Sequence, residues 1–363
     1  MGRFVTFGEV MIRMSPTGML RFRQSIPGRL ELTLAGAEAN VAASLATLGV
    51  DVRYVTALPK NPLAEAVMSQ LNATSMDTRH VLQVDRGRVG ICFIENGANQ
   101  RPSQVVYDRE NSAISLTPSS EYDWQSILAD SHWLHVTGIT PAISRNAADA
   151  TIQAVQQAQA LGVTVSCDLN FRTKLWRWDS NVAPQDLAGQ VMRRVLPHVD
   201  LLIANEEDCQ DVLGIQAGGS DVSAGRVDVS AYPDVARQVV QQFSSIRKVA
   251  TTLRASISAS HNNWGAMLYN AADDQAVFAP EASGEYAPYE IRNIVDRVGG
   301  GDAFAAGLMF ALSSDAFSDD AAALRFATAA SCLAHSTVGD FNFSTVDEIR
   351  TLMSGLGTGR VVR

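Results

Sequence analysis

The sequence predicts an α/β fold in which helices cover both faces of a mostly parallel sheet. Two observations support this fold. Near-continuous apolar runs alternate with stretches of helical pattern, which is typical of parallel strands buried on both sides. Each run ends in polar residues, and in such sheets ligands bind at the carboxyl ends of the strands. The predicted strands are 132–139, 164–170, 199–205 and 248–253, and the predicted helices are 144–161, 185–196 and 232–244.

The N-terminal part of the chain predicts the same order of elements. The segment 3–14 is apolar enough for a short strand, and 29–34 alternates well enough for another. A strongly helical run begins at Asn40 and ends at Gly49, a residue type that often closes helices. The segment 50–58 is again a strand, so this region predicts a βαβ unit.

A different pattern occupies residues 86–108. Two runs of strand-forming residues flank Asn96-Gly97, and Pro102 limits the second run, so we expect a hairpin here. Together with residues 13–34 it would build a small separate sheet. The Gly- and Ser-rich segment 214–231 predicts a surface insertion.

Composition excludes several classes of function. The chain has 363 residues, of which 46% are hydrophobic, and a formal net charge of −9, which argues against nucleic-acid binding as its main task. No apolar run approaches the roughly 18 residues of a membrane span. The four cysteines lie far apart in the sequence, which argues against a zinc site and favours a reducing, cytoplasmic location.

The most informative segment is the glycine-rich stretch 294–307. Gly299, Gly300 and Gly301 precede a run of helical pattern, and the free amides and positive dipole of a helix N-terminus can hold an anion. Asp302 places a carboxylate at the same point, where it can accept a proton from a substrate hydroxyl. The glycines alone also fit an ordinary turn with Asp302 as the helix cap. The spacing matches neither a P-loop nor a dinucleotide fingerprint.

This segment resembles the C-terminal signature of the ribokinase-type (PfkB) sugar kinases, D-T-x-G-A-G-D-x-F-x-x-G, with Arg297 in place of the Thr and Gly300 in place of the Ala. The family's N-terminal glycine-rich signature has a counterpart at 35–42. Within the family, the chain is most similar to the 2-keto-3-deoxygluconate kinases. That similarity rests on GEVMIRMSP, LAGAEANVAASLATLG, HVTGITPAIS, DLNFRTKLW, IANEED, TTLRASISAS and FNFSTVDEI.

The resemblance implies one ribokinase-like domain over residues 1–363, a three-layer αβα sandwich with a β-sheet lid from about 13–34 and 86–110. It implies ATP- and Mg²⁺-dependent transfer of a phosphoryl group to a sugar hydroxyl, with 2-keto-3-deoxy-D-gluconate giving its 6-phosphate as the favoured reaction. A homodimer or larger homo-oligomer is expected. A fructokinase- or ribokinase-like enzyme for a neutral sugar stays open, as does a non-catalytic sugar-binding protein on the same fold.

The resemblance also implies roles for single residues. Asp302 would be the general base, and the amides of Gly299, Gly300 and Gly301 would stabilise the developing negative charge. Asn205 and Asp208 would organise Mg²⁺ through water, although an acidic cluster also suits a helix start.

Gly36 and Asn40 would contact sugar hydroxyls. Asn40 could equally be a helix cap.

Arginines indicate an acidic substrate, because a guanidinium fork suits a carboxylate. Arg172 follows a predicted strand end, and Tyr107 with Arg109 resembles a Tyr-x-Arg pair of the sugar-acid kinases. Arg13 stands near the place where many neutral-sugar members carry an Asp. Any single one of these arginines could instead be an ordinary surface residue.

The nucleotide contacts are less well defined, because the family's usual glycine is missing near 251–256. We expect Thr252, Arg254 and Ser258 near the ATP phosphates and Gly339, in the loop 336–340, beside the adenine. Asp296 and Val298 match positions whose backbone carbonyls bind K⁺ in some members of the family. Potassium is therefore an optional cofactor in this interpretation.

Overall fold

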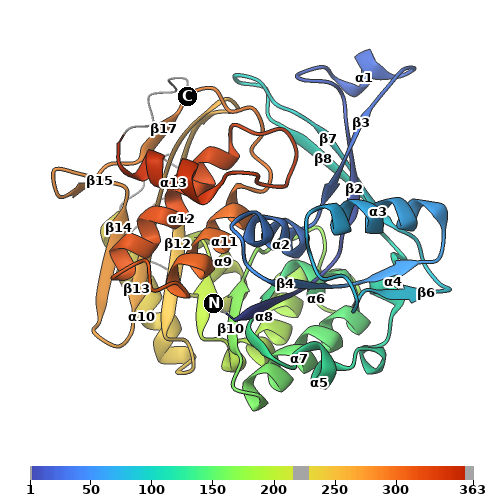
Figure 1. Cartoon of the computed structure of the whole chain (residues 1–363), viewed down its shortest axis with the longest axis horizontal. Helices are drawn as coiled ribbons and strands as arrows, with labels where there is room; N and C mark the ends of the chain where they lie inside the picture. The colour runs from blue at the N-terminus through green and yellow to red at the C-terminus, as the bar shows by residue number, and fades with distance from the viewer. Residues whose placement is uncertain (1, 216–228, 356–363) are drawn as a thin grey trace.

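The protein is described here by a computed structural model covering residues 2–215 and 229–355. Within these residues, nine strands form one sheet (Figure 1). Six neighbouring strands are parallel, which confirms the predicted α/β fold. In sheet order they are β4 (Val52–Val55), β1 (Arg3–Phe7), β9 (Ser131–Thr137), β10 (Thr164–Asp168), β11 (Leu201–Ile203) and β12 (Lys248–Ser258).

Antiparallel strands extend the sheet beyond β12, and the sequence analysis did not predict them. The long hairpin of β12 with β13 runs from Lys248 opposite Asn270 to Ser258 opposite His261. Short two-stranded sheets lie outside the main sheet. The additional strands are β13 (His261–Asn270), β14 (Gln275–Ala279) and β17 (Tyr289–Ile291) in the main sheet, and the pairs β5 (Ala57–Pro59) with β6 (Leu82–Val84) and β15 (Glu281–Ala282) with β16 (Glu285–Tyr286).

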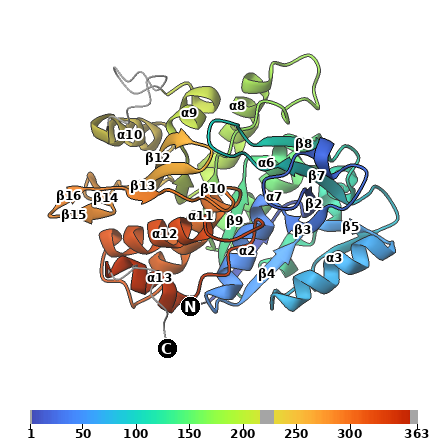
Figure 2. The ribbon, with the colours of Figure 1, turned by 90° about the horizontal axis from the view of Figure 1, so that it is seen from above.

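Helices cover both faces of the sheet, so the body has three layers (Figure 2). One face carries α2 (Ala37–Thr47), α3 (Pro62–Ala73), α11 (Gly300–Leu312), α12 (Asp320–Ala334) and α13 (Val346–Met353). The other carries α4 (Ala113–Leu116), α5 (Trp124–Ile127), α6 (Ile139–Ile143), α7 (Arg145–Ala160), α8 (Pro184–Val195), α9 (Glu206–Asp208) with the π-helical turn Cys209–Leu213, and α10 (Tyr232–Gln242).

Local sequence signals explain where the principal helices begin and end. The Ser144 hydroxyl accepts a hydrogen bond from the Ala147 amide and caps α7, and α8 begins with Pro184, which suits a first helical turn. After α2, Gly49 takes a φ of +84°, which is typical of the residue that closes a helix. The predicted helices are therefore confirmed, except that α2 begins at Ala37 and not at Asn40; Asn40 lies inside the helix and is not its cap.

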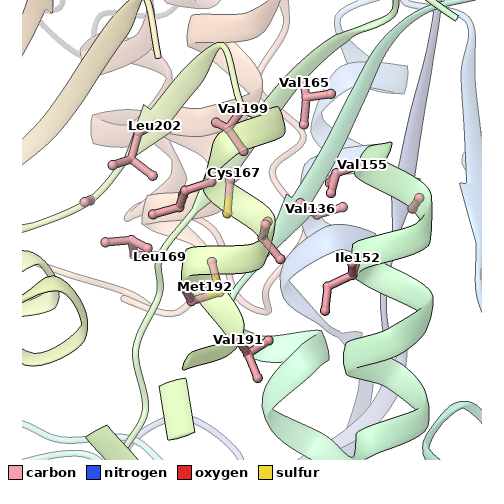
Figure 3. Close-up of a cluster of buried hydrophobic side chains, with 14 of the residues drawn as sticks. Val136, Ile152, Val155, Val165, Cys167, Leu169, Val191, Met192, Val199 and Leu202 are labelled. Carbon is pink, nitrogen blue, oxygen red and sulfur yellow. The ribbon is translucent and has the colours of Figure 1, made fainter. Parts of the chain in front are cut away.

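The apolar layer between the sheet and α7 and α8 fixes the body of the molecule. Figure 3 shows Ile152 and Val155 of α7 and Val191 and Met192 of α8 gathered around Cys167 of β10. All five side chains are buried. Burial of this kind is the main source of folded-state stability, and it holds the strand ends in fixed positions.

A separate four-stranded sheet, called the lid below, rises from one side of the body, at the upper right of Figure 1. Its strands lie in the order β3, β2, β7, β8, and only the β2–β7 pair is parallel. They come from the two segments predicted to form a small sheet. The lid consists of β2 (Met11–Ser15), β3 (Glu31–Ala35), β7 (Gly90–Glu95) and β8 (Gln104–Asp108), with the short helix α1 (Phe22–Ser25) between β2 and β3.

Three predictions from the sequence have different outcomes in the structure. The single strand predicted over 3–14 is wrong, because the chain leaves the main sheet after Phe7 and re-enters a strand in the lid at Met11. Most of the predicted insertion 214–231 lies outside the described residues. In the described part of the chain, no helix combines the length and the hydrophobicity that crossing a bilayer requires.

Candidate active site

The polar strand ends gather at one edge of the sheet, as the pattern predicted. In the parallel register, Asp168 at the end of β10 lies opposite Thr137 of β9 and Ile203 of β11. Asn205 and Asp208 follow β11 directly. This edge therefore collects side chains from three neighbouring strands.

The N-terminus of α11 is built from glycines that the packing requires. Gly299 has a φ of +84°, and a Cβ on it would lie 2.2 Å from the Asp340 carbonyl oxygen. A Cβ on Gly300 would lie 2.9 Å from the His335 ring, which explains the glycine where the family signature has Ala. The first helical hydrogen bond runs from the Ala303 amide to the Gly299 carbonyl. The amides before Ala303 thus have no helical acceptor and can bind an anion.

Asp302 lies in the first turn of this helix and is partly buried. The Asn40 side-chain amide donates a hydrogen bond of 2.7 Å to Asp302 Oδ2. Burial raises the pKa of Asp302 to about 7, and the negative charges of Asp340 and Glu38 act in the same direction. A carboxylate that titrates near neutral pH suits general-base chemistry.

A second group of carboxylates lies at the strand ends. Burial raises the pKa of Asp208 to about 6, while Arg172 and the amides of Asn205 and Phe171 oppose the shift. The pKa of Asp168 is also raised, first by burial and then by the charges of Asp208 and Asp302. Arg172 opposes this shift too, so its guanidinium is close enough to act on both carboxylates.

These carboxylates bear on the expected Mg²⁺ site. Asn205 Oδ1 accepts a hydrogen bond of 2.8 Å from the Asp208 amide and so fixes the start of α9. Across residues 2–215 and 229–355, no three His, Cys, Asp or Glu side chains converge in a way that could hold a metal ion alone. Mg²⁺ usually keeps several waters and binds through one or two carboxylates and substrate phosphates. Asp208 and Asp168, which are hard oxygen donors, fit that role.

The N-terminus of α2 forms the facing wall. Gly36 has a φ of +142°, and a Cβ there would lie 2.1 Å from the Glu9 carbonyl oxygen, so only glycine fits. Glu38 is fully buried and accepts hydrogen bonds from the hydroxyls of Thr137 at 2.7 Å and Thr140 at 2.8 Å. Glu38 thus fastens α2 to the end of β9 and is more than an acidic residue of the first turn.

The lid arginines are engaged by carboxylates. Arg109 is buried, forms an ion pair with Glu9, and lies 5.5 Å from the ring centre of Tyr107. Arg13 is 2% exposed, and its guanidinium bonds to Asp340. By contrast, Arg172 is exposed, and its Nη1 donates to the Phe171 carbonyl oxygen at 2.8 Å.

The predicted nucleotide residues lie along β12 and the loops beside it. Thr252 and Ser258 are half-buried and Arg254 is exposed. Arg297, which replaces the signature Thr, donates to the carbonyl oxygens of Ser258 and Ala259 and to Asn262 Oδ1. Arg297 therefore ties the β12–β13 hairpin to the loop before α11, a role that the sequence did not reveal.

Sequence reasoning also missed the part played by acidic residues around the site. Glu9 neutralises Arg109, and Asp340 contacts both Arg13 and Asn40. The sequence offered one signal for Glu9, namely its position beside Gly8 just after the first strand. Asp340 lies far from its partners in the sequence, so no local pattern could identify it.

Comparisons with known proteins agree with this geometry. A model of the pfkB family carbohydrate kinases matches residues 1–345. The chain is 31% identical over 355 residues to 2-dehydro-3-deoxygalactonokinase of Haloferax volcanii, covering 98% of each chain. It is 26% identical over 336 residues to a fructokinase of Klebsiella pneumoniae, covering 89% of this chain and 88% of the other. The crystal structure of 2-dehydro-3-deoxygluconokinase from Thermotoga maritima has a TM-score of 0.87 and 41% identity, covering 97% of this chain and 99% of that one.

Proposed function

Because the chain belongs to the pfkB family of carbohydrate kinases, we propose that it phosphorylates 2-dehydro-3-deoxy-D-gluconate on its 6-hydroxyl with ATP and Mg²⁺. The observation that carries the chemistry is Asp302, a carboxylate with a pKa near 7 at a helix N-terminus whose amides are free. A base for the hydroxyl and donors for the phosphoryl oxygens are thereby combined in one turn of backbone.

In this proposal, Asp302 accepts the proton of the sugar hydroxyl as the hydroxyl oxygen attacks the γ-phosphorus. The bond from the γ-phosphorus to the β–γ bridging oxygen breaks, and ADP leaves with that electron pair. The amides of Gly299, Gly300 and Gly301 donate hydrogen bonds to the transferring group, whose negative charge they stabilise. Asn40 holds the Asp302 carboxylate in place, and with Gly36 it borders the sugar. Most of the rate enhancement then comes from positioning and charge stabilisation.

Asp208, with Asn205 fixing its backbone, would hold Mg²⁺ through water, and Asp168 lies beside it. Burial without a cationic partner at ion-pair distance raises the pKa of both carboxylates, and a bound cation would offset that cost. When bound, the metal supplies charge neutralisation for the phosphates. Thr252, Arg254, Ser258 and Gly339 would border the nucleotide.

The substrate class rests on Arg172 and on the relatives. Two relatives that match nearly the full length of the chain are kinases of 2-dehydro-3-deoxy sugar acids. Arg172 offers an exposed guanidinium close to the carboxylate cluster, where a substrate carboxylate could bind as a bidentate partner. The fructokinase relative supports a second candidate, a kinase for a neutral sugar, at lower identity.

A coupled ADP-release assay tests the proposal. The substrate panel contains the gluconate and galactonate epimers of the keto-deoxy acid, fructose, ribose and adenosine. We expect kcat/KM for one of the acids to exceed that for fructose at least about a hundredfold, since only an acid can form a charge-assisted bidentate pair with the Arg172 guanidinium. Preference for a neutral sugar would overturn the substrate class, and no ADP release with any sugar would overturn the kinase assignment itself.

The Asp302→Asn variant tests the base in the same assay. We expect kcat to fall by about 10²–10⁴ while sugar binding changes little. Asp319→Asn is the matched control, because Asp319 only caps α12 at the protein surface. A kcat for Asp302→Asn within about tenfold of the parent would contradict the general-base role.

Assembly and monovalent cations remain predictions. Leu32 of β3 and Val106 of β8 are 59% and 58% exposed on the lid, which supports pairing of two copies through this sheet. Light scattering of the purified protein would test a homodimer. Replacing K⁺ with tetramethylammonium in the assay would test the expected cation at Asp296 and Val298. The cytoplasmic location also remains a prediction.

A further inference from the structure

A buried arginine joins the lid to the body next to the candidate active site. Arg13 of β2 donates from Nη1 to Asp340 Oδ1 at 2.6 Å and from Nη2 to Asp296 Oδ2 at 2.5 Å. Its Nε donates to the Ser15 hydroxyl at 3.1 Å. The two carboxylates come from different loops, one before α11 and one after α12. One guanidinium therefore bridges three separate segments of the chain.

Both loops shape the N-terminus of α11. Asp296 accepts hydrogen bonds from the amides of Val298 at 3.2 Å and Gly339 at 3.3 Å, so its carboxylate fixes the backbone that leads into the glycines. The carbonyl group of Asp340 packs against Gly299 so closely that no Cβ would fit between them. A displacement of either loop would move the amides that are proposed to bind the transferring phosphoryl group.

The same cluster continues to the candidate base. Asn40 Nδ2 lies 3.4 Å from Asp340 Oδ2 and 2.7 Å from Asp302 Oδ2. A contiguous series of polar contacts thus runs from Arg13 in the lid through Asp340 and Asn40 to Asp302. Such a series can transmit the position of the lid to the carboxylate, because each member is held by direct contacts with the next.

We propose that Arg13 is a positioning residue, which locks the lid onto the two loops around α11 and so holds the glycine amides and Asp302 in their reactive arrangement. This role rests on the proposed kinase function. It differs from direct binding of the substrate carboxylate, because each guanidinium nitrogen already has a partner and the side chain is only 2% exposed.

The chemistry of the side chain supports this assignment. A planar guanidinium can donate to two carboxylates in different directions at once, whereas an ammonium group is a point charge. The pair Asp296 and Asp340 would repel each other across the loops without a cation between them. Arginine also remains protonated when buried, so the cation of the bridge keeps its charge in the working range.

Arg13 also borders an open space. It helps line a cleft of about 580 Å³ between the lid and the body, together with Ser15, Asn96 and Gly339. In an Arg13→Ala variant, the volume of the lost guanidinium would connect with this cleft. A free guanidinium ion could then reach the two carboxylates from solution, which makes chemical rescue a direct test.

The experiment compares Arg13→Ala with the parent protein in the ADP-release assay, with and without guanidinium chloride at a low millimolar concentration, far below the range that unfolds proteins. We expect kcat to fall by about a hundredfold with little change in KM for the sugar acid, because geometry is lost and ground-state contacts are not. Guanidinium should restore at least a tenth of the parent kcat. A large rise in KM with kcat unchanged, or no rescue, would overturn the proposal.

Arg53→Ala is the matched control. Arg53 is also a buried arginine, paired with Asp77, but it lies on β4 and contacts the Ile127 carbonyl group away from the site. We expect it to lower the melting temperature without a rescuable loss of kcat. If guanidinium raised kcat equally in both variants, the effect would be general stabilisation and the proposal would fail.

Arg13→Lys keeps the charge and covers the case in which the alanine variant does not fold. Since lysine reaches one carboxylate at a time, we expect a loss of kcat that is smaller than for alanine and that guanidinium does not rescue. Full parent kcat in Arg13→Lys would overturn the proposal.

Hydrogen exchange separates this inference from the proposed function. In Arg13→Ala, or in Arg13→Lys if the alanine variant does not fold, amides of 296–301 and 338–341 should exchange faster than in the parent. In the alanine variant, guanidinium should slow them again. This readout needs no substrate, so it decides the inference even if the parent phosphorylates none of the sugars tested. Unchanged exchange in these two segments would refute the bridge while leaving the kinase assignment intact.

Discussion

At the junction of lid and body, carboxylates lie within ion-pair distance of arginines, whereas, among the described residues, those at the carboxyl edge of the sheet do not. At the junction, Arg13 lies between Asp296 and Asp340, and Arg109 pairs with Glu9. At the sheet edge, Asp168, Asp208 and Asp302 all have raised pKa values without a described arginine at ion-pair distance, whereas at the junction burial raises the pKa of Asp340 and its partner Arg13 opposes that shift. In the described part of the chain, no carboxylate lies within ion-pair distance of Arg172 or Arg254 there.

The difference separates structural charges from functional ones. A buried arginine with a carboxylate partner is already neutralised, so it has little capacity left for a substrate. Carboxylates with raised pKa values can still bind a cation from solution, and accessible arginines can still bind an anion, because each would stabilise the charge of the group that it meets. The charge pattern thus supports the proposals that the chemistry takes place at the sheet edge and that the junction connects lid and body.

Metal removal should give the largest effect and test the sheet edge directly. We expect chelation to abolish ADP release and added Mg²⁺ to restore it, because the carboxylates at the edge lack a cation of their own. The coupled assay with excess EDTA is the measurement. Full activity in EDTA would contradict the proposal that Asp208 and Asp168 hold Mg²⁺.

The Arg172→Ala variant should have the next largest effect. Losing a charge-assisted bidentate partner should cost about 2–4 kcal/mol in kcat/KM for the acid substrate. A slow neutral substrate should be affected much less, since Asp302 and the glycine amides are unchanged. Arg177→Ala, an exposed arginine of the same loop, is the control and should match the parent. Equal losses for acid and neutral sugars would assign Arg172 to the phosphates or to structure.

The pH dependence should report Asp302. Because its pKa is raised to about 7 and the base must be ionised, kcat/KM should fall about tenfold per pH unit below that value and level off above it. A profile that is flat from about pH 5.5 to 8 would remove Asp302 as the titrating base.

The same shift makes a prediction about stability. Between the ordinary value of 3.8 and about 7, the folded protein binds a proton at Asp302 that the unfolded chain releases. Its stabilising contribution is therefore present at low pH and lost as the pH rises through about 7. Asp302→Asn should raise the melting temperature relative to the parent more at pH 8 than at pH 5.5. A difference that does not depend on pH would contradict the raised pKa.

Breaking the Arg109–Glu9 pair of the junction should chiefly lower stability, with the smallest effect on the reaction. Glu9→Gln leaves the buried Arg109 without its carboxylate, which should cost about 3 kcal/mol in the free energy of unfolding. The exposed pair of Arg86 with Glu121 offers the control, and Glu121→Gln should cost less than about 1 kcal/mol. We expect kcat/KM for Glu9→Gln to stay within about tenfold of the parent. A larger catalytic loss without a stability loss would reassign Glu9 to the substrate.

The sequence was sufficient for the parallel strands and their helices because those signals are local. The apolar run 164–170 and the cap residues Ser144 and Gly49 each act over a few positions. The glycine-rich signature that ends at Asp302 is local as well. The family resemblance based on it is confirmed by the match over residues 1–345. The roles assigned to single site residues remain predictions.

The features that the sequence could not predict depend on contacts between segments that lie far apart in the sequence. The strand break after Phe7 follows from two different sheets competing for one apolar run. The partners of Arg13 and Arg109 come from distant segments, so the sequence could not show that carboxylates of the same chain contact both arginines. Ion pairs between distant segments leave no recognisable pattern in the sequence.

The separation of Arg13 from Asp340 has a consequence for biosynthesis. The two residues lie 327 positions apart, so β2 leaves the ribosome long before Asp340 does. At about 5–20 residues per second, roughly 14–57 s pass before Asp296 emerges and roughly 16–65 s before Asp340 does, so the Arg13 guanidinium stays without both partners for that time. The connection between lid and body is therefore completed only after both loops around α11 and α12 have been synthesised, long after β2 itself.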